Sequence, residues 1–83
     1  METRVALVGI IVEDINSATE VNSILHEFNQ YIIGRMGIPY SPKGINIISV
    51  VVDAPGDVIS TISGKLGQLN GISSKVLYTK TSK

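Results

Sequence analysis

The sequence has no cysteine, no net charge and no apolar run long enough to cross a membrane. Without cysteine, the chain can form no disulfide, ligate no iron–sulfur cluster, build no thiolate zinc site and present no thiol nucleophile. This composition favours a reducing, cytoplasmic location. The 83 residues are enough for one hydrophobic core, so we expect residues 1–83 to form a single domain.

The charges balance, because seven acidic and seven basic side chains give a formal net charge of zero. A protein that binds duplex DNA normally presents a basic face, since neutralisation of phosphates supplies most of its affinity. We therefore expect no direct nucleic-acid binding. The start of the chain does not resemble a cleavable signal peptide. The longest apolar run, Val5 to Val12, is far shorter than the ~20 residues of a membrane helix, so the sequence predicts a soluble protein that does not contact a membrane.

The first half of the sequence predicts a strand, a helix and a shorter strand. Residues Val5 to Val12 are apolar on both alternating faces, which is typical of a central strand. Ser17 and Glu20 have the spacing of a capping box at a helix start. Tyr31 to Met36 should form an edge strand, because Gly34 interrupts it and Arg35 is charged. The apolar stripe of the predicted helix consists of Ala18, Val21, Ile24, Leu25 and Phe28.

The second half predicts a loop, a strand, a helix and a last strand. Two prolines and two glycines punctuate Gly37 to Gly44, which indicates a loop. Ile45 to Asp53 is again apolar on both faces, as a second central strand would be. Pro55 suits the first turn of a helix, and Ile72 to Lys80 alternates as a final edge strand should. The second helix should bury Val58, Ile59, Ile62 and Leu66.

This order of elements predicts an α+β fold, the ferredoxin-like βαββαβ sandwich. In that fold a four-stranded antiparallel sheet carries two helices on one face, and the first and third strands are its central pair. The most apolar strands of the sequence fall at these two central positions.

Residues with catalytic or metal-binding chemistry are few and scattered. The third strand has no aromatic residues on which RNA bases could stack. Glu13 and Asp14 would repel a phosphate, and adjacent acids at a helix start are more often there for the helix dipole. His26 is the one histidine, and helical spacing turns it away from the buried stripe, so a closed metal site would need partners from other subunits. We expect no catalytic residue, no cofactor and no bound metal.

The stretch from Gly34 to Gly44 is the strongest candidate for a ligand site. Its glycines can expose backbone N–H groups, and its charged and aromatic side chains could hold a small anionic effector. The alternative is a rigid connection whose prolines restrict the unfolded chain. The candidate residues are Arg35, Gly37, Tyr40, Lys43 and Gly44.

The two central strands also predict an oligomer, either a dimer or a tetramer. Helices cover one face of such a sheet, so a monomer should alternate apolar and polar residues along each strand. Here both faces are apolar. The uncovered face should carry Val5, Leu7, Ile45 and Ile47, which we take as the candidate interface, with Arg35 and Lys75 at its rim.

Three segments together carry a resemblance to a known family. The chain resembles the family of proposed iron-only ([FeFe]) hydrogenase system regulators from about Arg4 to Lys80. The segments are Tyr31-Ile32-Ile33-Gly34-Arg35-Met36-Gly37-Ile38-Pro39-Tyr40, Ile48-Ser49-Val50-Val51-Val52-Asp53-Ala54-Pro55 and Ser63-Gly64-Lys65-Leu66-Gly67.

The resemblance implies a small, free-standing domain similar to amino-acid-sensing ACT domains and to the C-terminal domain of the nickel-responsive repressor. The sequence departs from the repressor in two ways: no ribbon–helix–helix segment comes before the first strand, and the histidine and cysteine set that binds nickel is missing. It departs from many ACT domains in having no glycine in the first strand–helix loop. Two hypotheses follow. The chain is either a regulatory interaction module that binds an effector or a protein partner, or a small enzyme or ligand-binding protein with a pocket between subunits.

Overall fold

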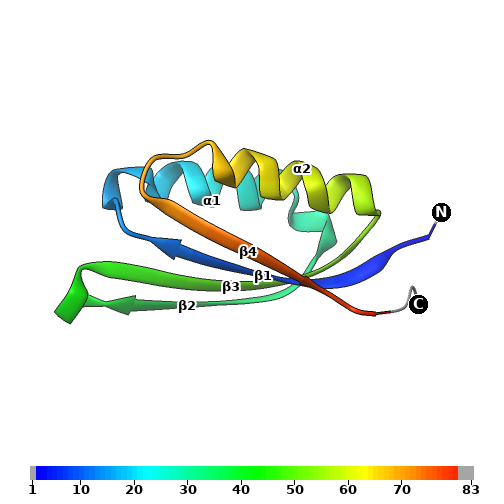
Figure 1. Ribbon diagram of the computed structural model, residues 1–83, viewed down its shortest axis with the longest axis horizontal. Coiled ribbons are helices and arrows are strands. Elements are labelled where there is room, and N and C mark those ends of the chain that lie inside the picture. Colours follow the sequence, from blue (N-terminus) through cyan, green and yellow to red (C-terminus); the bar gives the residue numbers. More distant parts are fainter. Residues whose placement is uncertain (1, 81–83) are drawn as a thin grey trace.

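The computed structural model describes residues 2–80, which form an antiparallel sheet with two helices packed on one of its faces (Figure 1). The strands are β1 (Arg4–Val12), β2 (Ile32–Tyr40), β3 (Ile45–Ala54) and β4 (Ile72–Tyr78). The helices are α1 (Ala18–Glu27) and α2 (Gly56–Gly67), and the 3-10 turns are η1 (Ile15–Ser17), η2 (Asn29–Tyr31) and η3 (Ser41–Lys43).

The strand order β2-β3-β1-β4 confirms the predicted ferredoxin-like topology. β1 and β3 are the central pair, and β2 and β4 are the edges, as their apolar content indicated. At the middle of the sheet Val8 pairs with Val50 on one side and with Val76 on the other. Directly paired residues share a face of the sheet, so this register decides which side chains the helices cover.

The core lies between the helices and one face of the sheet. Alternate residues of the two central strands are buried there, together with the apolar stripes of both helices. The buried side chains of the helices are Val21, Leu25, Ile59, Ile62 and Leu66, and those of the strands are Ala6, Val8, Ile10, Val12, Ile48, Val50, Val52 and Ala54. Neither helix of residues 2–80 is long and apolar enough to cross a bilayer.

The second strand is longer than the sequence predicted. We expected it to end at Met36 and a loop to follow, but β2 continues to Tyr40 and pairs with β3 as far as Tyr40–Ile45. The expectation was wrong because β2 is an edge strand, and an edge strand tolerates proline on its unpaired side. The turn that replaces the loop is short, with η3 followed by Gly44 at a φ of 65°.

The predicted capping box at Ser17 was also wrong. The 3-10 turn η1 precedes α1, and Ser17 belongs to that turn with a helical backbone and no side-chain capping bond. Asp14 caps η1 instead, because its Oδ1 accepts the backbone N–H of Asn16 at 3.0 Å. The Ser17 hydroxyl is buried and donates to the carbonyl oxygen of Asn70 at 2.7 Å. Ser17 therefore joins the start of α1 to the turn before β4.

Candidate functional site

The sheet face opposite the helices has no element of the described chain packed over it. The register places alternate residues of all four strands on this face, which we call the open face. Its apolar members are Val5, Leu7, Ile11, Met36, Ile38, Tyr40, Ile45, Ile47, Val51 and Leu77.

Several of these apolar side chains are far more exposed than core residues. Met36 is 59% exposed and Leu77 69%, whereas the core residues on the helix side of the central strands are at most 8% exposed. The charged strand residues of the open face are Asp53 and Lys75, which have opposite signs. The open face is therefore an extensive apolar surface.

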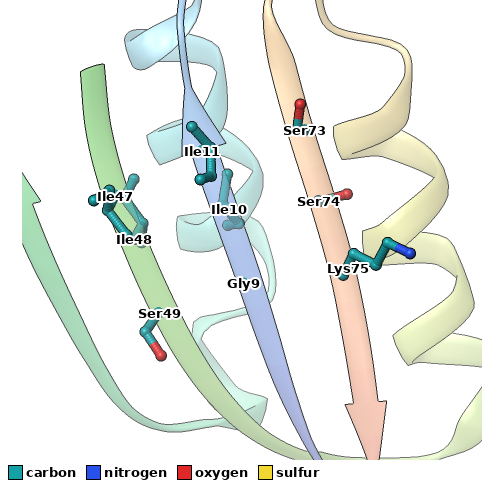
Figure 2. Close-up of a pocket in the computed structure, with 9 residues that line it drawn as sticks. All are labelled: Gly9, Ile10, Ile11, Ile47, Ile48, Ser49, Ser73, Ser74 and Lys75. Atoms are coloured by element: carbon teal, nitrogen blue, oxygen red, sulfur yellow. The ribbon is translucent and has the colours of Figure 1, made fainter. Parts of the chain in front are cut away.

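A hollow of about 490 Å³ lies on the open face around Gly9, and we call it the Gly9 hollow. Residues 9–11 of β1, 47–49 of β3 and 73–75 of β4 line it (Figure 2). Gly9 leaves the space because it has no side chain, and an added Cβ would meet nothing closer than the Lys75 carbonyl oxygen at 4.0 Å. Ser49 and Ser73 give the hollow a polar edge, while the Lys75 side chain extends toward the outer side of β4 (Figure 2).

A second concavity, of about 280 Å³, lies on the helix side of the sheet. It is lined by Asn22 from α1, by Arg35 and residues 37–39 from β2, and by Asn46 and Ile48 from β3. We call it the Arg35 groove. The Arg35 guanidinium donates a hydrogen bond to Asn22 Oδ1 at 2.9 Å, which holds the side chain against α1.

The structure separates the five residues of the predicted ligand loop. Arg35 and Gly37 lie together in the Arg35 groove, but Tyr40 pairs with Ile45 on the open face. Lys43 and Gly44 lie at the turn between β2 and β3, away from both. The five do not form one site, because strand alternation sends Tyr40 to the face opposite Arg35 and Gly37.

The predicted interface residues do share one face. Val5, Leu7, Ile45 and Ile47 all lie on the open face, while their role in an oligomer stays a prediction. The placement of Arg35 at the rim of this face was wrong. Arg35 pairs with Val50, which is buried beneath the helices, so Arg35 lies on the helix side.

His26 is exposed on α1, as the helical spacing indicated. Within residues 2–80 no three histidine, aspartate or glutamate side chains gather closely enough to hold a metal ion.

Sequence reasoning missed two polar contributors to the Arg35 groove, Asn22 and Asn46. The position of Asn46 carried a signal that could have been used. It occupies the same alternating positions as Ile48, Val50 and Val52, where a polar side chain interrupts an apolar row. Asn22 lies among polar residues on the exposed side of α1, so no sequence pattern marks it.

The fold and these surfaces define a ferredoxin-like α+β domain with an uncovered, apolar sheet face. The chain belongs to the TM1266-like family, described as "Iron-only hydrogenase system regulator, putative", whose model matches residues 4–76. No curated protein sequence matches it.

Among solved structures, the chain is similar to the uncharacterized protein TM1266 from Thermotoga maritima. The two are 34% identical with a TM-score of 0.91, over 95% of this chain and all of the other. A formyltetrahydrofolate deformylase from Pseudomonas putida KT2440 is similar at 13% identity and a TM-score of 0.64, over 88% of this chain and 28% of that one. An unknown protein from Galdieria sulphuraria is similar at 14% identity and a TM-score of 0.66, over 96% and 47% of the two chains. The latter two likenesses concern the fold alone.

Proposed function

We propose that this chain is a non-catalytic, cytoplasmic regulatory domain of the iron-only hydrogenase system, that it works as a homo-oligomer joined through its open face, and that it responds to a small effector. The description of its family supports the link to the hydrogenase system. The observation that carries the proposal is the exposed apolar surface spread over all four strands.

The extent of the open face favours a second copy of the chain as its occupant. The largest apolar patch on a typical monomer covers ~300–600 Å², and here apolar side chains of every strand contribute. Covering roughly 500 Å² on each of two copies would bury ~1,000 Å², the size at which specific interfaces begin. At ~25 cal/mol per Å² the gross gain is about 25 kcal/mol, which exceeds the ~4–15 kcal/mol cost of association.

The charges of the open face are compatible with such self-association. Asp53 and Lys75 have opposite signs, so a twofold dimer can pair Asp53 of one copy with Lys75 of the other. The face therefore has no single-sign charge that would repel a second copy.

The alternative of a small enzyme needs a titratable cluster on the open face, and the sequence offered Arg35, Ser49 and Lys75 for it. Arg35 lies on the other side of the sheet. Lys75 is then the titratable side chain lining the Gly9 hollow, and it extends outward past β4 (Figure 2). This arrangement favours a binding role over catalysis.

A pair of charge insertions tests the oligomer. Ile47→Glu places a carboxylate in the middle of the open face, where Ile47 is 37% exposed, whereas Ile15→Glu places it on η1, where Ile15 is 72% exposed. We expect sedimentation velocity to show dissociation of the Ile47→Glu variant and an unchanged assembly for Ile15→Glu, with both far-UV circular dichroism spectra native. Equal sedimentation of the two variants would contradict the proposed interface.

Deletion of the gene in a host that makes an iron-only hydrogenase tests the regulatory part. We expect hydrogenase activity or transcript level to change at least twofold, and complementation to restore it. Unchanged activity and transcript under all growth conditions that induce the enzyme would contradict the regulatory assignment.

A further inference from the structure

The Arg35 groove contains a positive charge without a compensating carboxylate. Within residues 2–80 the one ion pair joins Lys65 Nζ to Glu27 Oε1 at 3.1 Å, and the hydrogen-bond partner of the Arg35 side chain is the neutral amide of Asn22. A guanidinium has five N–H donors in a planar fork. Most of these donors are therefore available to an anion in the groove.

The groove also contains a polar side chain whose hydrogen-bonding capacity is unused. Asn46 is half-buried at the end of an otherwise apolar row of β3, and in the described part of the chain its amide makes no side-chain hydrogen bond. Buried polar groups normally have a hydrogen-bond partner, and Asn46 is partly removed from solvent. The Asn46 amide lines the groove, where a ligand could donate to it and accept from it.

The groove stays open because β2 has glycine at its centre. This glycine is Gly37. Close packing does not explain its presence, because an added Cβ would meet no atom within 4 Å. Glycine in a strand interior weakens the strand and often marks a place that a ligand approaches closely. Beside it, Pro39 and Ile48 supply apolar lining.

We propose that the Arg35 groove binds a small organic carboxylate. The Arg35 guanidinium receives the carboxylate, the Asn46 amide receives a hydroxyl or second polar group, and Pro39 and Ile48 contact the carbon chain. The Asn22 amide positions Arg35, because its Oδ1 accepts from the guanidinium and its Nδ2 donates to the Ala18 carbonyl oxygen. Arginine matches a carboxylate in geometry and charge, and a lone guanidinium among neutral amides suits one negative charge better than a phosphate dianion. The groove is an open concavity of about 280 Å³, which has room for a small ligand.

This proposal deepens the effector part of the proposed function, on which it rests, and it does not depend on the oligomer. The test is a titration of ¹⁵N-labelled protein, at constant ionic strength, with acetate, glycolate, succinate and inorganic phosphate. We expect glycolate to shift the amide signals of Arg35, Gly37 and Asn46 saturably, and the two dianions, succinate and phosphate, to shift them far less.

Two variants and a matched control assign the site. Arg35→Gln should weaken carboxylate binding about ten- to hundredfold, the range expected for loss of charge-assisted hydrogen bonds, and Asn46→Ala should weaken it severalfold. Lys43→Gln removes the same charge from the nearby turn, outside the groove, and should change the affinity by less than twofold.

The proposal is overturned if no carboxylate shifts these signals at 50 mM, if Arg35→Gln binds as well as the unaltered protein, or if phosphate alone binds in the groove. Light scattering on the same samples separates the two proposals. A monomeric protein that still binds carboxylate at Arg35 contradicts the oligomer alone, and an oligomer that binds none contradicts the groove alone.

Discussion

Replacing Gly71 with alanine should destabilise the fold far more than the same change at Gly44. Both glycines have a positive φ, 68° at Gly71 and 65° at Gly44, and alanine in that conformation costs ~1–2 kcal/mol. Alanine also lowers the conformational entropy of the unfolded chain, which offsets ~0.4–1 kcal/mol of this cost at each site. The net cost expected from backbone conformation alone is therefore about 1 kcal/mol at either site.

The surroundings of the two glycines differ. A Cβ on Gly44 would meet no atom within 4 Å, but a Cβ on Gly71 would lie 2.5 Å from the Asp14 Cβ and 2.9 Å from the Asp14 nitrogen. The Gly71 carbonyl also accepts the N–H of Glu13 at 2.7 Å, so the chain cannot move away without weakening that bond. Overpacking of this kind costs ~1–3 kcal/mol, which brings the expected total for Gly71→Ala to about 2–4 kcal/mol.

Urea unfolding followed by circular dichroism measures both variants, at one chain concentration because oligomer stability depends on it. The difference between the two free energies of unfolding isolates the contact with Asp14. If Gly71→Ala and Gly44→Ala lose the same stability within about 0.5 kcal/mol, the close approach of the β4 turn to Asp14 is not as described.

Three further predictions follow from the contacts and the charge of the chain. Ser17→Ala should cost ~1–2 kcal/mol in the same assay, because it leaves the Asn70 carbonyl without its buried donor at 2.7 Å; no measurable loss would contradict that bond. Ile59→Ala should cost ~2–5 kcal/mol, since Ile59 is fully buried, and Ile33→Ala, where the side chain is 63% exposed, should cost under 1 kcal/mol; similar losses would contradict the core assignment. The purified protein should carry no stoichiometric transition metal by elemental analysis and show no sequence-selective DNA binding at physiological salt, and one metal per chain, lost on His26→Ala, would refute the first half.

The order of elements could be predicted from the sequence because burial determines it. Val5–Val12 and Ile45–Asp53 are apolar on both faces, and that pattern identified them as the central strands of an antiparallel sheet with an uncovered side. The same alternation placed Ile45 and Ile47 on that side. The pattern depends on which face of the sheet is buried along the whole strand. The assignment of residues to faces therefore does not require the exact first and last residue of each strand.

The residues that form the site cannot be predicted from the alternation of apolar and polar residues alone. Pro39 and Gly37 favoured a loop by their local preferences, but the edge position of β2, a tertiary property, lets the strand run through them. One consequence is that Tyr40 and Arg35 lie on opposite faces. The hydrogen bond from Arg35 to Asn22 links residues on two different elements, and no spacing rule connects them.

The measurement that tests the account most directly is the molar mass of the unaltered protein, determined by multi-angle light scattering at low micromolar concentration. The chain mass is 8.9 kDa. An open face occupied by a second copy predicts a mass at least twice that value, which persists on dilution across the low micromolar range. A stable monomer of 8.9 kDa under those conditions would contradict the claim that this surface joins copies of the chain.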